Sequence, residues 1–461
     1  MPIPPIDFGA RLPAWSALPF LGILLSIALS PIVAPRLWHR HYPTVALFWG
    51  VLLTGPLLWV FGRAAAHELL HTALAEYLPF VILLAALFTI GGGIHLRGRL
   101  PGTPLANAGL LGLGTLLASL LGTTGAAMIL IRPLLAANAG RRHRAHTVVF
   151  FIFLVGNLGG ALTPLGDPPL FLGFLAGVPF FWTLKLLPEM LFVAGLVLLA
   201  YLGLETFLYR RERGRVPPPG EGAVGNGGRP GGGKLIIEGA RNCLFLLGVL
   251  AAVIVSGTWH PGEIDLWGIE LPIENLTRDA VLALLLLASW WTTAPRIRQA
   301  NGYSWAPIKE VAILFAAIFA TILPLLAILR AGQRGALAPL LGAVHTPGQF
   351  FWATGVLSSL LDNAPTYLAF LSTALGRFFP GVTERTAVLR LIAEQPAFLQ
   401  AIATGAVFMG ANTYLGNAPN LMVKAIAEKA GVEMPSFLGY VGRYALPVLL
   451  PVFLLAGWIF F

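Results

Sequence analysis

The sequence predicts an all-α polytopic membrane protein built from two inverted-topology repeats. The first observation is composition: the chain is 57% hydrophobic and only 11% charged, whereas a soluble domain has about 25% charged residues. The second is a series of apolar runs of about 17–25 residues, long enough to cross a bilayer as helices. The third is a pair of Gly- and Pro-rich interruptions, at 156–169 and 410–420, in corresponding places of the two halves. Paired interruptions of this kind indicate the binding site of a transporter.

Charge and cysteine content exclude other classes. The formal net charge is +10, but the Lys and Arg residues lie in short loops, as the orientation signals of membrane proteins do. We therefore expect a lipid bilayer, and no nucleic acid, as partner. A single cysteine, Cys243, excludes an intrachain disulfide and a cysteine-based metal cluster. We expect no cleavable signal peptide, because residues 1–16 lack a basic start and 17–34 is long enough to be a span.

The first repeat is expected over residues 1–209. Its apolar runs predict spans near 17–35, 43–62, 77–96, 147–165 and 183–208. We also predict a re-entrant hairpin at about 105–137 and a broken helix at about 147–170. Residues 210–242 are rich in Gly, Pro and Arg, which predicts a flexible cytoplasmic linker.

The second repeat is expected over residues 243–461 with the same layout. Its apolar runs predict spans near 243–258, 279–294, 307–329, 398–415 and 437–461. A second hairpin is predicted at about 349–376 and a second broken helix at about 398–420. Three local matches occur in the same order in both halves and favour an internal repeat: 85–88 with 316–319, 118–121 with 358–361, and 163–169 with 413–419.

The basic residues predict the orientation. If each long apolar region enters and leaves on one side, the Arg clusters at 97–99, 141–144 and 210–215 all fall on one face. The positive-inside rule makes that face cytoplasmic, and each half then has an odd number of crossings, so the halves point oppositely. We expect both termini outside, the linker in the cytoplasm, and the bacterial inner membrane as location. The exceptions, which this topology places outside, are Arg377, Arg385 and Arg390.

The first interruption, at 156–169, reads G-N-L-G-G-A-L-T-P-L-G-D-P-P. Proline removes a backbone donor and clashes with the preceding turn, so a helix cannot run straight through it. In a membrane, such a break is tolerated only where it is buried in protein or lines a cavity. The second interruption reads G-A-N-T-Y-L-G-N-A-P-N at 410–420, and the expected tip of the second hairpin reads S-S-L-L-D-N-A-P-T at 358–366. We predict that these segments form one midplane binding site.

Two acids are expected at membrane depth, Asp167 and Asp362. Ionisable groups there cost roughly 2.5–3.5 kcal/mol on insertion scales and mark ion or proton pathways. The surrounding oxygens of carboxylates, amides and hydroxyls suit a small hard cation. No Lys or Arg lies beside the acids, so an anion would need exposed helix N-termini instead. The candidate ion- or substrate-binding residues are Asn157, Thr163, Asp167, Asp362, Asn363, Thr366, Asn412, Thr413, Asn417, Thr123 and Thr124.

These residues favour cation exchange. A carboxyl group kept from bulk water can exchange a proton for a metal cation near neutral pH. One site that binds either Na⁺ (or Li⁺) or H⁺, never both, is sufficient for antiport. We therefore predict a secondary Na⁺/H⁺ antiporter, with no enzyme activity, no cofactor and no structural metal. The competing interpretation of Asp167 and Asp362 is a local helix cap.

The quoted motifs G-N-L-G-G-A-L-T-P-L-G-D-P-P and S-L-L-D-N-A-P-T resemble the two half-site motifs of the ion transporter superfamily. Its members include NhaD-type sodium/proton antiporters, citrate–metal transporters and arsenite permeases, and the similarity spans nearly the whole chain. The resemblance implies inverted repeats, two re-entrant hairpins, a midplane site, an elevator-like movement and usually a homodimer. For the sodium/proton branch it implies roles for Asn157, Asp167, Asp362 and Asn363. That branch has an acid where this chain has Gly122, so a citrate, other carboxylate or oxyanion permease is the alternative.

One motif suggests a different class of protein. The segment His67-Glu68-Leu69-Leu70-His71 matches the H-E-x-x-H pattern of zinc proteases. We expect it in the short loop before the third span, and no third ligand is evident nearby in the sequence. A polar interfacial turn is therefore preferred over a zinc site.

We expect the remaining isolated ionisable residues to lie at or to reach the membrane–water interface. Arg132 is expected to snorkel towards the cytoplasm from the second arm of the first hairpin; if it faced the site, an anionic substrate would be favoured. His95 is expected at the interface, although it could sense pH. Glu76 and Glu205 are expected near span ends with solvated head groups.

Overall fold

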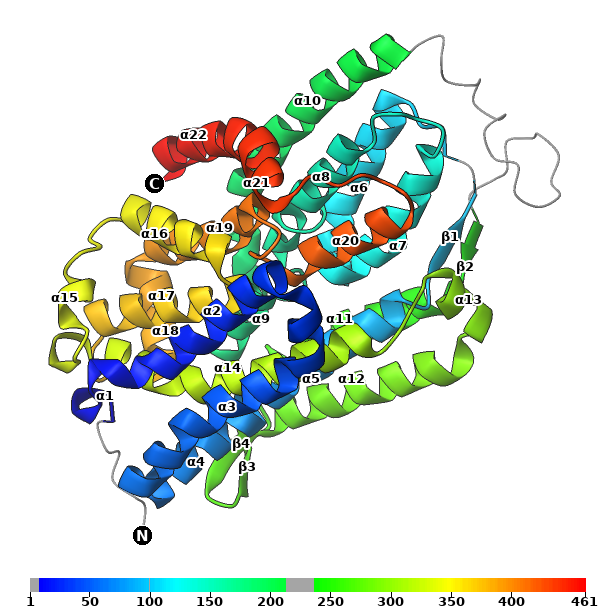
Figure 1. The fold of residues 1–461 in the computed structure, drawn as a ribbon. Helices are drawn as coiled ribbons and strands as arrows, with labels where there is room; N and C mark the ends of the chain where they lie inside the picture. Colours follow the sequence, from blue (N-terminus) through cyan, green and yellow to red (C-terminus); the bar gives the residue numbers. More distant parts are fainter. Residues whose placement is uncertain (1–7, 99, 213–235) are drawn as a thin grey trace.

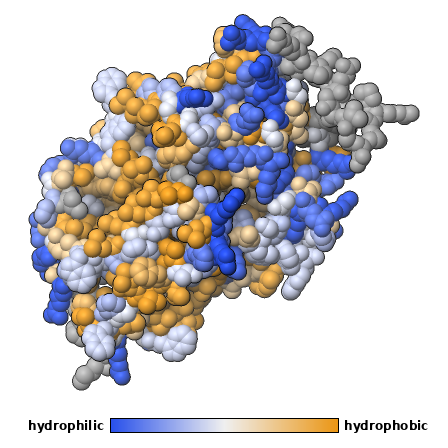
Figure 2. Space-filling view, viewed as in Figure 1, coloured by the Kyte–Doolittle hydropathy of each residue, from blue (hydrophilic) through white to orange (hydrophobic). Residues whose placement is uncertain are grey.

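The computed structural model describes residues 8–98, 100–212 and 236–461, and helices form the body of the protein (Figure 1). Eight of the described helices are long and apolar enough to cross a membrane, or nine if one bent pair counts as a span. Apolar side chains cover much of the surface in Figure 2, and large ones such as Trp59 and Trp458 are fully exposed to the surroundings, at 90% and 83%. The predicted all-α polytopic membrane fold is confirmed.

The helices of the first half follow the predicted spans. Several begin with a proline, such as Pro104 and Pro168, whose fixed φ suits the first helical turn. The helices are α1 (Phe8–Arg11), α2 (Leu18–Val33), α3 (Pro35–Phe61), α4 (Arg63–Thr72), α5 (Leu78–Gly91), α6 (Pro104–Leu121), α7 (Thr123–Ala137), α8 (Ala145–Leu154), α9 (Pro168–Leu175) and α10 (Leu187–Glu212).

The second half repeats this order of long and broken helices. Its helices are α11 (Arg241–Ser256), α12 (Ile273–Thr292), α13 (Pro295–Ala300), α14 (Ala306–Arg330), α15 (Ala338–Leu341), α16 (Pro347–Leu360), α17 (Asn363–Phe378), α18 (Glu384–Glu394), α19 (Pro396–Met409), α20 (Ala418–Lys429), α21 (Phe437–Tyr440) and α22 (Leu450–Phe460).

Two small antiparallel sheets lie at opposite ends of the helical body (Figure 1). One pairs β1 (His95–Arg97) with β2 (Ile236–Glu238), and the other pairs β3 (Glu263–Leu266) with β4 (Ile269–Pro272). Strand β4 leads directly into α12, and α13, which follows the far end of α12, contacts β1. The length of α12 therefore separates the two sheets.

Both long apolar regions fold as helical hairpins. In hairpin 1, α6 and α7 pack against each other and are separated by Gly122 alone, whose φ of 74° is in the left-handed region that favours glycine. At its base, Asn107 and Asn138 exchange two hydrogen bonds of 2.9 and 3.0 Å. In hairpin 2, formed by α16 and α17, Arg377 donates to the carbonyl of Val344 at 2.6 Å. Each hairpin therefore enters and leaves at one end; re-entry into a bilayer and the inverted relation of the halves stay predictions.

The prediction of a flexible linker over 210–242 is wrong at both of its described ends. Helix α10 continues to Glu212, and Ile236–Glu238 forms a strand on His95–Arg97. The backbone N–H and C=O groups of β1 need partners, and Ile236–Glu238, which follows the Gly-rich run, supplies them as a second strand. Residues 213–235 of the predicted linker lie outside the described residues.

The third helical span starts earlier than predicted. Helix α4 begins at Arg63 and joins α5 through a π-helical segment, Ala73–Tyr77, so one helix runs from 63 to 91. The H-E-x-x-H motif consequently lies on a helix and not in a loop. Ala, Glu and Leu are strong helix formers, so polar side chains alone do not end the helix here.

Glu205 and Glu76 differ from expectation. Glu205 is fully buried, at 0% exposure, and pairs with basic side chains of α8 and of the segment before it. Glu76 is half-buried inside the π-helical segment and not at a span end. In both cases hydropathy located the helix but could not show which of its faces is covered by neighbouring helices.

Candidate functional site

The two interruptions form two broken helices of the same design. After α8, a short 3₁₀ turn (Leu158–Leu162) leads through extended backbone at Thr163 to the start of α9. After α19, a short 3₁₀ turn (Gly410–Asn412) leads through extended backbone at Thr413 to the start of α20. The proline-containing segments thus break the helices where the sequence predicts.

The same hydrogen bonds hold each break against its hairpin. The hydroxyl of Thr163 donates to the carbonyl of Ser119 in hairpin 1. The hydroxyl of Thr413 donates to the carbonyl of Ser359 in hairpin 2 at 2.6 Å. An internal repeat would produce such matched contacts, because equivalent residues then have equivalent neighbours.

Asp167 lies where the hairpins and breaks meet. Asp167 is buried, at 1% exposure. Its Oδ1 accepts from Thr123 at the tip of hairpin 1 (3.1 Å) and from Asn417 of the second break (2.9 Å). Its Oδ2 accepts from the amide of Asn363 at the tip of hairpin 2. A carboxylate has about four acceptor positions, so these three donors leave room for one further ligand.

The helix-cap interpretation fails for Asp167 and holds for Asp362. Asp167 precedes α9, yet its side chain makes no capping hydrogen bond. Pro168 and Pro169 offer no N–H group, and the N–H of Leu170 donates to the backbone carbonyl of Asp167 at 3.1 Å. Asp362 precedes α17, and its Oδ1 accepts from the backbone N–H of Ala364 at 3.0 Å. Asp362 therefore caps a helix while also facing the cavity described next.

A cavity with about 870 Å³ of empty space, part of it open to solvent, adjoins Asp167. Four helices start at its wall: α7 at Thr123, α9 at Pro168, α17 directly after Asp362, and α20 at Ala418. The N-terminus of a helix has a partial positive charge that favours anions. Apolar side chains of α5 and α14 also line the cavity. Among the lining residues that the structure describes, none is Lys, Arg or His.

Six of the predicted site residues meet at this cavity. Thr123, Thr124, Asp167, Asp362 and Asn417 line it, and Asn363 contacts Asp167. In the described part of the chain, the amide oxygen of Asn363 is buried without a hydrogen-bond partner. A free carbonyl-type oxygen beside a carboxylate is a suitable cation ligand.

The other predicted residues position the backbone and do not line the cavity. Asn157 donates to the side chain of Asn420 at 2.8 Å and so ties the two breaks together. Thr163 and Thr413 hold the hairpins as described above. Asn412 donates to the hydroxyl of Ser359 at 2.9 Å, and Thr366 donates to the carbonyl of Asp362 at 2.9 Å.

Sequence reasoning did not select Asn420, Ser119 or Ser359. Asn420 accepts from Asn157 and donates to the carbonyls of Gly410 and Thr413, so it orders both breaks. Ser119 and Ser359 occupy matching positions in the repeated A/S-S-L-L segment. The repeated segment is visible in the sequence, but the contacts of Ser119 and Ser359 can be seen only in the folded structure.

Two features that would favour another function, Arg132 and the H-E-x-x-H segment, do not line the cavity. Arg132 is not in its lining, and among the described residues its Nη1 has no hydrogen-bond partner. His67 of the H-E-x-x-H segment contacts the carbonyl of Gly268 at 2.9 Å. Within 8–98, 100–212 and 236–461, no three His, Cys, Asp or Glu side chains gather as a metal site.

Comparison with known proteins gives one finding. A family model described as "Putative citrate transport" matches residues 9–461, which includes both hairpins and both broken helices. No curated protein matches the chain. The breadth of the match places the Asp167 cavity inside the part of the chain that the family shares.

Proposed function

The chain belongs to this citrate-transport family, and we propose that it is a secondary transporter that moves citrate, or a similar carboxylate, bound to a metal cation through the Asp167 cavity. Resemblance to the ion transporter superfamily further suggests the bacterial inner membrane and a homodimer.

The main support is the charge of the cavity. A free citrate anion would face two acids, Asp167 and Asp362, and none of the described lining residues is Lys or Arg. Two like charges about 4 Å apart repel by about 4 kcal/mol at an effective dielectric constant near 20. Each helix N-terminus offsets only about 0.3–1 kcal/mol. A cation between citrate and the acids removes the repulsion, and the four helix N-termini then face the outer carboxylates.

The oxygen ligands around Asp167 support a hard cation. The carboxylate has one acceptor position left, and the amide oxygen of Asn363 has no partner among the described residues. Mg²⁺ and Ca²⁺ both take carboxylate and carbonyl oxygens and keep some positions for other ligands. A divalent ion bound by citrate would therefore connect the substrate to Asp167.

Na⁺/H⁺ antiport is the second candidate, and the same two acids favour it. A cavity with two carboxylates and no basic lining residue can bind Na⁺ or H⁺ alone. The two candidates differ in whether the carboxylate substrate is required for ion movement.

Proteoliposomes that contain an internal pH-sensitive dye distinguish the two. We would measure uptake of radiolabelled citrate with a chelator, with Mg²⁺ and with Ca²⁺, and proton movement after NaCl or LiCl pulses without citrate. The proposal predicts uptake that requires a divalent ion and is lost in Asp167→Asn, while Glu433→Gln, which changes an exposed acid, leaves it unchanged. Proton movement with Na⁺ alone, and no citrate uptake under any condition, would establish antiport instead.

A further inference from the structure

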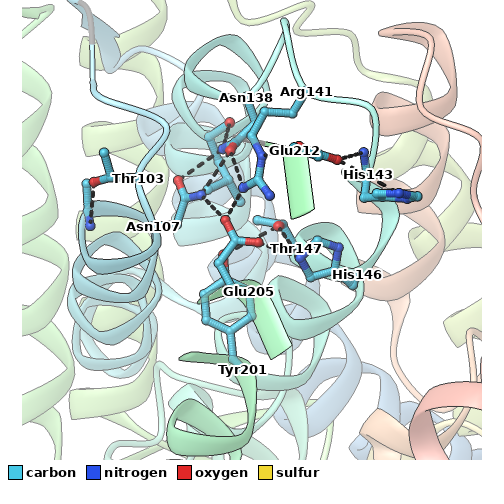
Figure 3. Close-up of polar contacts among 12 residues, drawn as sticks. Thr103, Asn107, Asn138, Arg141, His143, His146, Thr147, Tyr201, Glu205 and Glu212 are labelled. Atoms are coloured by element: carbon cyan, nitrogen blue, oxygen red, sulfur yellow. Dashed lines mark hydrogen bonds and ion pairs between the residues drawn. The ribbon is translucent and has the colours of Figure 1, made fainter. Parts of the chain in front are cut away.

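A buried charged cluster lies at the base of hairpin 1 (Figure 3), and none of its residues lines the Asp167 cavity. We define the anchor cluster as Arg141, His146, Glu205 and Glu212. Arg141 pairs with Glu205 through Nη1 and with Glu212 through Nε at 3.2 Å. His146 Nε2 lies 2.5 Å from the second carboxylate oxygen of Glu205. The exposed fractions of these four side chains are 3%, 3%, 0% and 8%.

The anchor cluster joins hairpin 1 to the helices behind it. Asn107 of α6 donates to Glu205 of α10 at 2.9 Å, and it also exchanges hydrogen bonds with Asn138 at the end of α7. His146 brings α8 to the same carboxylate (Figure 3). Both ends of the hairpin, α8 and α10 therefore meet at Glu205.

The charges of the anchor cluster balance when it holds one added proton. Two carboxylates and one guanidinium leave a net charge of −1, and a protonated His146 brings the sum to zero. An uncompensated charge in a buried site is strongly destabilising. The anchor cluster is therefore most stable when it holds one added proton, and His146 lies directly beside the Glu205 carboxylate.

The other groups that face the anchor cluster do not place a second buried positive charge beside Glu205. Tyr201 of α10 is fully buried and contacts Thr147, and Tyr209 lies against the Arg141 guanidinium. His143 is half-exposed and 3.9 Å from Glu212. Nearby basic groups have other partners. Arg144 donates to the carbonyl of Gly431. Helix α20 also packs on α8, and its Lys424 pairs with Glu428 at 2.7 Å.

We propose that the anchor cluster is a second proton-binding site, which keeps the base of hairpin 1 closed while His146 is protonated and releases it when His146 loses its proton. The opposite end of hairpin 1 presents Thr123 to Asp167. Proton release at the base would therefore loosen a wall of the transport cavity. This inference does not depend on which substrate is transported.

The test compares the wild type with charge-matched variants. His146→Gln removes the imidazole and leaves two carboxylates against one guanidinium, whereas the double variant His146→Gln/Glu212→Gln has one carboxylate against one guanidinium. We would measure amide hydrogen exchange of the segments around 102–108 and 136–140 in purified protein between pH 5.5 and 8.5. At each pH the double variant serves as the reference, which cancels the intrinsic pH dependence of exchange.

We expect protection of these segments in the wild type to fall by about tenfold or more relative to the double variant as pH rises, which corresponds to roughly 1.4 kcal/mol of local opening free energy. His146→Gln should be open throughout the range. Equal protection of wild type and double variant at every pH would overturn the proposal. If the variants fail to fold, constant protection of the wild-type base relative to α14 across the range would overturn it as well.

Discussion

Asn417 donates a hydrogen bond of 2.9 Å to the Asp167 carboxylate across 250 residues of sequence. Asp167 directly precedes α9 and Asn417 directly precedes α20, so the two residues hold matching positions at the ends of the two breaks. One break contributes the charge and the other contributes a donor that orients it. The cavity therefore has one fully buried carboxylate where a symmetric repeat would have two.

Asp167→Asn should lower transport by roughly 100-fold or more, because it removes the carboxylate that binds the cation, an interaction of the size of a buried charge pair. The thermal midpoint should stay the same or rise, since a buried charge is costly for folding. Uptake into proteoliposomes and thermal unfolding in detergent check the two parts. A variant that keeps full transport would show that Asp167 does not bind the transported ion.

The capping and cavity roles of Asp362 can be separated. Asp362→Asn keeps a capping side chain for Ala364 and removes the charge, whereas Asp362→Ala removes both. We expect Asp362→Ala to lose about 0.5–2 kcal/mol of stability and Asp362→Asn to lose far less. If the charge matters for transport, uptake should fall to the same extent in both variants. Full uptake in Asp362→Asn would restrict this residue to its cap.

Gly160→Ala should damage the site without unfolding the protein. A Cβ at Gly160 would lie 2.8 Å from Asp167 Cβ and 2.8 Å from Thr123 Cγ2, so these two residues must move apart. The matched control is Gly109→Ala in α6, where nothing lies within 4 Å and alanine should stabilise the helix by about 0.5–1 kcal/mol. We expect a higher KM for the carboxylate in Gly160→Ala only. Equal KM values in both variants would contradict the described packing.

Arg141→Ala, in the segment before α8, should be strongly destabilising because Arg141 is buried. It leaves Glu205 and Glu212 buried without their guanidinium partner, which costs about 3–5 kcal/mol. Arg142→Ala next to it removes an exposed charge and should change stability by less than about 0.5 kcal/mol. Thermal unfolding of the two variants in the same detergent gives the comparison. Similar midpoints would mean that Glu205 is not buried in the folded protein.

The single cysteine tests the predicted orientation. Cys243 is exposed near the sheet of β1 and β2, and Glu263 begins the sheet at the opposite end of the body. A membrane-impermeant maleimide added to intact cells should label Glu263→Cys in a Cys243→Ser background and should leave the wild-type Cys243 unlabelled until the cells are permeabilised. The reverse pattern would place the linker outside and invert the topology.

The sequence predicted the elements well because their determinants are local. Apolar runs located most of the spans, although the second and third spans start 8 and 14 residues earlier than predicted, and the Gly and Pro residues at 156–169 and 410–420 placed both breaks. The early start of α4 and the burial of Glu205 were not predicted. Each depends on which neighbouring helix covers a polar face, and hydropathy along one segment does not contain that information.

The sequence by itself therefore determined a helical membrane protein with two hairpins, two breaks and the acids Asp167 and Asp362 beside them. Only the tertiary structure decided which acid is a cap and which receives donors from three other segments, and that Arg132 stays away from the cavity. The physical reason is the separation along the chain of the residues that determine each feature. Helix length and helix breaking depend on neighbouring residues, whereas the surroundings of a buried charge depend on the packing of segments that are hundreds of residues apart.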